Sequence, residues 1–291
     1  MPQFRKKVWA FYKRYGRHDL PWRKTKDPYK ILVSEVMLQQ TQVERVIPFY
    51  NDFIKKFPTA RKLAAAPLAS VLVAWQGLGY NRRAKMLQAA AAMVGHGIFP
   101  KRIEELEKLS GVGPYTARAI AAFAYNQDVV FIETNIRTAI IHHFFTRGTR
   151  TSSPRSARAA RPIQLLIKNI PVPRVSDTQI LEVLQKLLPK GQAREWYSAL
   201  MDYGAYLKKS GVQLNRKSQR YAKQSKFVGS NREARGAILR ELARGSAAEP
   251  RLTNLFGPVR RAQSRAALAD LFAEGLIQKR GKVFTLPRGR V

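Results

Sequence analysis

Residues 109–117, which read Leu-Ser-Gly-Val-Gly-Pro-Tyr-Thr-Ala, constrain this chain more than any other stretch. Gly111 and Gly113 stand between an amphipathic segment and an alanine-rich segment, residues 116–125, that has the composition of a helix. Glycine permits left-handed backbone angles and close approach to another surface, and the first N–H groups of a helix lack partners. A helical hairpin near residues 104–125 is therefore expected to bind an anion such as a nucleic-acid phosphate. An ordinary helix–helix turn with glycine caps explains the same residues.

The charge balance favours a polyanionic partner. The chain of 291 residues carries 53 lysines and arginines against 19 aspartates and glutamates, a formal net charge of +34. Such an excess destabilises a fold by self-repulsion and is useful mainly beside a polyanion. A hydrophobic content of 45% argues for folded domains and against a disordered basic tail. We expect a nucleic acid as the partner, with a membrane surface as the alternative.

The absence of cysteine limits the cofactors that this chain could hold. Disulfides, thiolate zinc sites and cysteine-ligated iron–sulfur clusters are excluded, and we expect no metal site. The first 16 residues alternate apolar and basic side chains, which predicts an amphipathic helix and not a signal peptide. Because no stretch approaches the length of a transmembrane helix, we expect a soluble, intracellular protein. We also expect it to be a cytoplasmic monomer, associated with the nucleoid if the source is bacterial.

A long helix is expected over residues 29–50, after an Asp-Pro start. It would place Glu35, Gln39 and Gln42 at i, i+4 and i+7, as a polar stripe on one face. A solvated face is the commoner meaning of such a stripe. The amides of Gln40 and Gln42 could equally hydrogen-bond to base edges, because an amide both donates and accepts.

Residues 75–80, Trp-Gln-Gly-Leu-Gly-Tyr, predict a glycine turn that presents an aromatic ring. Tyr80 is followed by Arg82, Arg83 and Lys85, so it could wedge into a base stack beside cations that bind phosphate. Packing of the tyrosine on a neighbouring helix is the alternative. No segment before residue 145 shows sustained β-alternation, so this part is predicted to be all-α.

Two segments are rich in basic residues and poor in apolar ones. Residues 146–162 predict a mobile basic loop that touches phosphate backbone, and residues 208–226 a linker or a DNA-facing strap. Between them, the apolar spacing predicts short helices at residues 163–170 and 178–188 and a longer amphipathic helix at residues 195–207.

The composition changes near residue 231, where three helical segments precede a stretch that alternates as two strands. Three helices and a terminal hairpin predict a winged-helix-like domain over residues 226–291, a variant of the helix-turn-helix. A small interaction module with the same fold is the alternative. Residues 1–225 are predicted to form the other domain.

Four stretches together carry a family resemblance: residues 20–22, 34–43, 75–80 and 109–117. They resemble the MutY adenine DNA glycosylases of the helix–hairpin–helix superfamily, which includes endonuclease III. The run Glu-Val-Met-Leu-Gln-Gln-Thr-Gln is specific to that branch, whereas Gly-Val-Gly marks only the superfamily. The resemblance covers roughly residues 1–225 and implies two all-α subdomains with DNA across their cleft and a base flipped into it. The implied function is a monofunctional DNA glycosylase of base excision repair, with adenine as the inherited substrate.

The resemblance also assigns roles to four residues. Glu35 matches the acid that protonates the leaving adenine. Tyr115 stands where strand-cutting relatives hold lysine, so lyase activity is not expected. Asn135 matches an asparagine that follows, by two residues, an aspartate that stabilises the cationic sugar or attacks it; in this chain that position is Glu133. We expect Tyr115 and Asn135 to position sugar and water.

The glycines of the hairpin, Gly111 and Gly113, would hold a phosphate, and the hairpin could also hold a monovalent cation. Tyr80 and Gln40 are the candidates for insertion into the base stack of the DNA, with Gln42 and Arg82 as further DNA contacts.

The sequence departs from the family pattern at three points. Glu133 has one methylene more than aspartate, and a displacement of ~1 Å can lower a rate by ~10²-fold. The four-cysteine iron–sulfur loop is replaced by residues 207–226, and residues 226–291 do not resemble the domain that inspects 8-oxoguanine. One protonated acid and one ionised carboxylate still suit cleavage of an N-glycosidic bond. A non-catalytic protein that binds lesions or unusual DNA structures is the alternative.

Overall fold

The structure is a computed structural model that describes residues 1–95, 97–146, 175–212, 214 and 226–287. The chain forms two compact units, Met1–His18 with Ala121–Lys223 and Asp19–Ile120 with Gln224–Val291. All of the expected basic loop except Thr146, and the expected helix at residues 163–170, lie outside the described residues.

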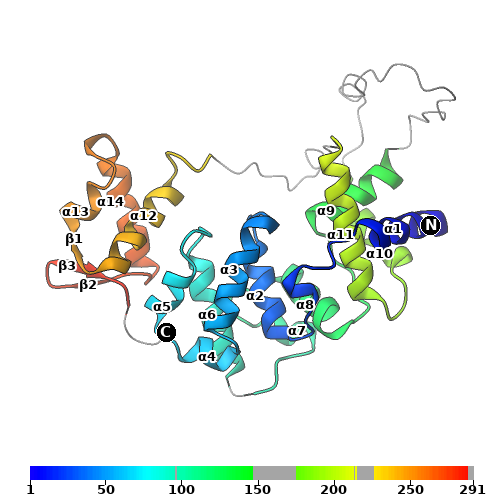
Figure 1. Cartoon of the computed structure of the whole chain (residues 1–291), viewed down its shortest axis with the longest axis horizontal. Coiled ribbons are helices and arrows are strands. Elements are labelled where there is room, and N and C mark those ends of the chain that lie inside the picture. The colour runs from blue at the N-terminus through cyan, green and yellow to red at the C-terminus, as the bar shows by residue number, and fades with distance from the viewer. Residues whose placement is uncertain (96, 147–174, 213, 215–225, 288–291) are drawn as a thin grey trace. The chain divides into compact units, whose positions relative to one another are not determined.

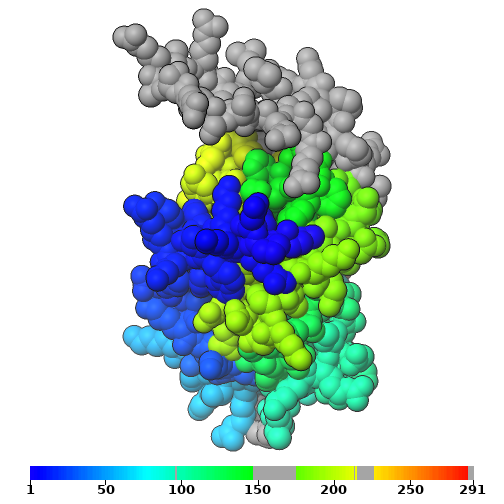
Figure 2. Space-filling model, turned by 90° about the vertical axis from the view of Figure 1, so that its right-hand side faces the viewer, coloured from blue at the N-terminus to red at the C-terminus, as the bar shows by residue number. Residues whose placement is uncertain are grey.

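The first unit is helical (Figure 1). Its elements are α1 (Pro2–Tyr15), the end of α8 (Pro114–Tyr125), α9 (Thr134–Ile140), the π-helical turn η2 (Ile141–Phe145), α10 (Asp177–Leu187) and α11 (Ala193–Lys209). Helix α11 packs against α9 and α1, and Figure 2 shows α1 across the surface with α11 beside it. The rings of Phe4 on α1 and Trp196 on α11 meet edge to face at 6.4 Å.

The helices of the first unit largely confirm the sequence prediction. Phe4 and Val8 are the buried residues of α1, as its amphipathic pattern predicts. Ser176 and Gln179 form a capping box at the start of α10. The prediction that a linker or strap begins at Lys208 is wrong at that end, because α11 extends to Lys209.

The second unit begins with a series of helices. They are the 3₁₀ turn η1 (Pro21–Arg23), α2 (Pro28–Leu38), α3 (Val43–Lys56), α4 (Ala60–Ala65), α5 (Leu68–Ala74), α6 (Arg82–Val94), α7 (Ile103–Leu106) and the start of α8. Helix α2 packs against α3 and α6, and α4 also packs against α6. Trp75 is fully buried and anchors the turn that follows α5.

The expected continuous helix over residues 29–50 is wrong. Helix α2 ends at Leu38 and α3 begins at Val43, and Gln40 between them has φ +56°. The helix breaks because of Arg83, which follows Gln39 by 44 residues. Its guanidinium group donates hydrogen bonds to the carbonyls of Val36 (2.7 Å) and Gln39 (2.6 Å). A continuing helix would need the Val36 carbonyl for the residue-40 N–H. The polar stripe of Glu35, Gln39 and Gln42 on one helix face therefore does not exist.

The C-terminal module completes the second unit. Its elements are α12 (Asn231–Arg244), β1 (Ala247–Ala248), α13 (Glu249–Thr253), the 3₁₀ turn η5 (Pro258–Arg260), α14 (Arg261–Ala273), β2 (Gln278–Arg280) and β3 (Val283–Thr285). The antiparallel sheet has the order β1-β3-β2, and Phe284 pairs with Ala247 on one side and Lys279 on the other. Gly281 takes φ +58° in the hairpin turn. The expected three helices and terminal hairpin are confirmed, and β1 is an additional short strand.

In the part of the chain that the structure describes, no helix combines the length and the apolar character needed to cross a membrane.

Candidate active site

Glu35 projects from α2, a helix whose start is well defined. The Asp27 side chain accepts a hydrogen bond from the Tyr29 N–H (2.9 Å), and Pro28 occupies the first turn, where its missing N–H has no consequence. Eight of the eleven residues of α2 are buried, and Glu35 is only 7% exposed. A carboxyl group so placed needs hydrogen-bonding partners, because burial without them is costly.

One partner of Glu35 comes from the helical hairpin. The Tyr115 hydroxyl, on the first turn of α8, donates a hydrogen bond to Glu35 Oε2 across 3.0 Å. The two residues are 80 positions apart in the sequence, and the family resemblance had assigned both to the active site without placing them in contact. The structure therefore brings together the predicted acid and the predicted hairpin tyrosine.

The hairpin between α7 and α8 has the geometry that its glycines predict. Gly111 takes φ +75°, and a β-carbon there would lie 3.0 Å from the β-carbon of Met86 on α6, so the turn packs closely. Gly113 is exposed with open space around its α-carbon, so another molecule can approach it. Helix α8 begins at Pro114, two residues earlier than expected, because proline suits the first helical position.

Glu133 caps the N-terminus of α9 in the first unit. Its Oε2 accepts hydrogen bonds from the N–H groups of Asn135 (2.6 Å) and Ile136 (3.4 Å), and its Oε1 accepts one from Asn135 Nδ2 (3.2 Å). Burial raises the pKa of the Glu133 carboxyl, while these hydrogen bonds and the nearby Lys208 ammonium oppose the rise. The predicted residues Glu133 and Asn135 are thus in direct contact, and Asn135 holds both carboxylate oxygens of Glu133 by hydrogen bonds.

Two residues of α11 that the sequence analysis did not select lie close to this pair. Gly204 lies so near α9 that a β-carbon would be less than 3.0 Å from the carbonyl oxygen of Asn135. Lys208 lies one turn after Gly204 on α11. Burial lowers the pKa of its side chain, and the charge of Glu133 raises it. A glycine within an otherwise amphipathic helix was the available signal for the close approach. Nothing local distinguished Lys208 from the lysines that follow it.

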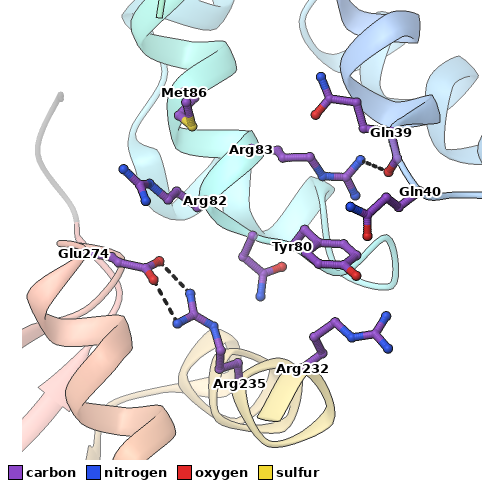
Figure 3. Close-up of a pocket in the computed structure, with 10 residues that line it drawn as sticks. Gln39, Gln40, Tyr80, Arg82, Arg83, Met86, Arg232, Arg235 and Glu274 are labelled. Carbon is purple, nitrogen blue, oxygen red and sulfur yellow. Dashed lines mark hydrogen bonds and ion pairs between the residues drawn. The ribbon is translucent and has the colours of Figure 1, made fainter. Parts of the chain in front are cut away.

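Three of the predicted DNA contacts share one pocket of about 530 Å³ in the second unit (Figure 3). They are Gln40, Tyr80 and Arg82. Tyr80 takes φ +48° at the end of the predicted glycine turn, and the buried Arg83 donates to the Gly79 carbonyl at 3.2 Å. Gln42 does not line this pocket and is instead the residue that precedes the first turn of α3.

Tyr80 neither packs fully on a neighbouring helix nor projects alone. It is half-buried, with the guanidinium of Arg83 5.4 Å from its ring centre and that of Arg232 at 5.2 Å. Burial lowers the pKa of Arg83 to about 10. The sequence analysis did not select Arg83 or Arg232 as structural partners of this ring.

The iron–sulfur cluster that the resemblance implies for the family does not fit this chain. Its four ligands are cysteine thiolates, and the sequence has no cysteine. Across the described residues, no three histidine, aspartate or glutamate side chains are grouped so that they could hold a metal ion.

Comparisons with known proteins identify the family of this chain. Residues 33–164 match the HhH-GPD superfamily of base excision DNA repair proteins. The adenine DNA glycosylase of Mycolicibacterium smegmatis is 32% identical over 286 residues, which cover 91% of this chain and 89% of that protein. The chain therefore belongs to the adenine DNA glycosylase family of the HhH-GPD superfamily. The alignment is long enough to include at least part of the C-terminal module.

Other adenine DNA glycosylases align over a shorter region. That of Mycobacterium tuberculosis is 47% identical over 135 residues, 45% of this chain and 44% of the relative. That of Buchnera aphidicola is 42% identical over 144 residues, 48% of this chain and 41% of the relative. The chain thus spans less than half the length of these two glycosylases.

Solved structures confirm the fold expected for a helix–hairpin–helix glycosylase. A thermostable thymine-DNA glycosylase superposes with a TM-score of 0.54 at 24% identity, over 70% of this chain and 87% of that one. A non-covalent endonuclease III–DNA complex gives a TM-score of 0.51 at 20% identity, over 71% and 84%.

Proposed function

We propose that this protein is a monofunctional DNA glycosylase of base excision repair. It would flip a mispaired or damaged base out of double-stranded DNA and hydrolyse its N-glycosidic bond, with adenine as the first candidate. The observation that carries the proposal is the buried Glu35 carboxyl group, hydrogen-bonded to Tyr115 on the helical hairpin. The named activity of the relatives supports the same reaction.

The proposed reaction needs an acid at the base and a negative charge at the sugar. Glu35, in its protonated form, gives its proton to a ring nitrogen of the base, so the electrons of the breaking C1′–N bond leave with a neutral base. The ionised Glu133 stabilises the cationic sugar. Water then adds to C1′, and its proton returns to Glu35. Tyr115 and Asn135 hold the acid and the carboxylate through the hydrogen bonds described above, and they would also position the sugar and the water.

The Glu133 carboxylate is well held in spite of its additional methylene. Its bonds to the N–H groups of Asn135 and Ile136 fix one oxygen at the positive end of α9. Pre-organisation of this kind favours a charge-stabilising role, because the group need not reorient during the reaction.

DNA is the proposed partner for electrostatic and geometric reasons. A net charge of +34 favours a polyanion. The turn with Gly111 and Gly113 would bind a backbone phosphate, alone or with a monovalent cation, while Gln40, Tyr80 and Arg82 would contact the stack and the backbone. Gln42, which lies outside their pocket, is proposed as a further DNA contact at the start of α3. We further propose that the protein is a cytoplasmic monomer, associated with the nucleoid if the source is bacterial.

A non-catalytic DNA-binding protein is the second candidate, because glutamate replaces the family aspartate at position 133. It would bind damaged duplexes without turnover, and binding would not depend on Glu35.

Single-turnover base release separates the two candidates. The duplex panel contains adenine opposite 8-oxoguanine, adenine opposite guanine, hypoxanthine, uracil, and thymine opposite guanine. We expect release by the wild type, a loss of about 10²–10⁴-fold in Glu35→Gln, and a loss in Glu133→Ala. Glu182→Gln, which changes an exposed carboxylate of α10, serves as the control and should match the wild type. Binding without release of any base by the wild type would favour the second candidate.

A further inference from the structure

Lys208 lies near the end of α11, on the face of that helix that packs against α9 (Figure 1). Gly204 marks this face, because a β-carbon there would meet the backbone of Asn135 on α9. Residues four apart in a helix share a face, so Lys208 follows Gly204 on the side of α9. Lys208 is accordingly half-buried, whereas Lys209, the next residue, is exposed.

The same contact between helix backbones also fixes the place of Glu133. Asn135, which Gly204 approaches, follows Glu133 by two residues and donates hydrogen bonds to both of its carboxylate oxygens. One charged residue therefore lies two positions before this contact on one chain segment, and the other lies four positions after it on α11. The backbones that carry Glu133 and Lys208 are held together without a loop between them that could move.

Each of these two charges favours the ionised form of the other. Burial raises the pKa of the Glu133 carboxyl, and the Lys208 charge lowers it. Burial lowers the pKa of Lys208, and the Glu133 charge raises it. The N–H groups of Asn135 and Ile136 also lower the pKa of Glu133, but they would do the same for any carboxylate that caps this helix.

The other charged groups on the elements packed against α9, which are α10, η2 and α11, have partners of their own or are exposed. Ion pairs join Arg137 to Asp177 and Asp202 to Arg17, and Arg194 donates to the Ala124 carbonyl beside Glu195. The pKa values of His142 and His143 are lowered, which favours their neutral forms, and His143 bonds to Tyr203. The exposed groups are Glu182, Lys186 and Lys209. In the described part of the chain, Lys208 is thus the cation placed to act on Glu133.

We propose that Lys208 is a positioning residue, whose ammonium group holds the Glu133 carboxylate in the ionised form that the proposed reaction uses. The inference rests on the proposed function and deepens it, because it adds a residue that acts on base release only through Glu133. Lys208 belongs to the segment that stands in place of the family's iron–sulfur loop, so the family resemblance assigns it no role.

The test compares two neighbouring lysines. Lys208→Met removes a charge and keeps a side chain of similar length, and Lys209→Met removes one from the adjacent exposed position. The titration of Glu133 is followed in the free protein by the ¹³C signal of its carboxyl group, which is identified by its loss in Glu133→Gln. We expect the pKa of Glu133 to rise by about one pH unit in Lys208→Met only. Lys208→Arg, which keeps the charge, should titrate as the wild type does.

Single-turnover base release, measured as a function of pH, gives a second readout that a merely structural role would not change in the same way. Below the pKa of Glu133, release by Lys208→Met should be about 10-fold slower than by the wild type, because less of the carboxyl group is ionised. Above that pKa, the two rates should converge. When Glu133 is already glutamine, Lys208→Met should cause no further loss.

An unchanged Glu133 titration in Lys208→Met would overturn the inference. An equal loss of release with and without the Glu133 carboxylate would also overturn it, and in either case the proposed function stands if the wild type releases base. If the wild type releases no base but the Glu133 titration depends on Lys208, the proposed function fails and the effect of Lys208 on Glu133 stands. Should Lys208→Met lower the melting temperature, Lys208→Gln gives the same comparison.

Discussion

The backbone of α11 at Gly204 lies against the backbone carbonyl of Asn135. A β-carbon at this glycine would be less than 3.0 Å from the carbonyl oxygen and 3.0 Å from the α-carbon of Asn135. Because Asn135 also donates hydrogen bonds to both oxygens of Glu133, the approach of α11 fixes the place where this carboxylate is held.

The close approach predicts that Gly204→Ala is destabilising. The added methyl group must displace backbone, so we expect a decrease of about 1–3 kcal/mol in the free energy of unfolding. Gly236→Ala, in the interior of α12, is the control, since its nearest neighbour would be the flexible end of Arg240 at 3.6 Å. It should be stabilising by about 0.5–1 kcal/mol. Denaturant unfolding measures both, and equal midpoints for Gly204→Ala and the wild type would contradict the packing.

Glu133→Gln is predicted to separate helix capping from charge. The amide oxygen of glutamine can still accept from the N–H groups of Asn135 and Ile136, so the melting temperature should change little. Loss of the negative charge should lower single-turnover base release by about 10²–10³-fold. Glu133→Ala should lose the cap as well, at about 0.5–2 kcal/mol. Full activity in the glutamine variant would remove the proposed electrostatic role.

Tyr115→Lys is predicted to introduce strand cleavage. A lysine amine at this place can attack C1′ of an abasic site and form a Schiff base with loss of water. Borohydride reduction on a preformed abasic duplex should then trap a covalent complex, which needs no base release by Glu35. Tyr15→Lys, at an exposed position of α1, is the control and should trap none. A Tyr115→Lys variant that binds the duplex but traps nothing would place the hairpin tyrosine away from the sugar.

His143 is predicted to make stability depend on pH. Its Nε2 lies 2.8 Å from the Tyr203 hydroxyl, and burial, with the charges of His142 and Lys7, lowers its pKa to about 4. Between its ordinary value near 6.5 and 4, the unfolded chain binds a proton that the folded chain does not, so stability falls as pH falls through this window.

The measurement for His143 is the denaturant midpoint at pH 7 and pH 4.5. His143→Gln keeps a partner for Tyr203 but cannot take up the proton, so its midpoint should fall less than that of the wild type. His18→Gln, at an exposed position, should behave as the wild type does. Parallel decreases in all three proteins would show that His143 is not the titrating group.

Several local features could be predicted because their causes are local. The Asp-Pro start of α2, the Gly-x-Gly turn before α8 and the alternation of the final hairpin all act within a few residues. The family motif added the identities of Glu35, Tyr115, Glu133 and Asn135. Motif and pattern together were enough to assign the fold class.

The break between α2 and α3 could not be predicted, because its cause is distant in sequence. Residues 39–42 have ordinary helical composition, and only the buried guanidinium of Arg83 uses the carbonyls that a continuing helix would need. Lys208 is a similar case. It reads as the first cation of a basic strap, and only the packing of α11 on α9 brings its charge near Glu133.

The sequence by itself determined the all-α class, the helical hairpin, the terminal winged module and a list of candidate residues, because these follow from periodicity, glycine and proline positions, and motif. Only the tertiary structure decided which candidates meet: Tyr115 with Glu35, and Arg232 with Tyr80 across 152 positions of sequence. Side-chain contacts between segments so far apart depend on how whole helices pack, and that packing is a property of the folded chain, not of any local pattern.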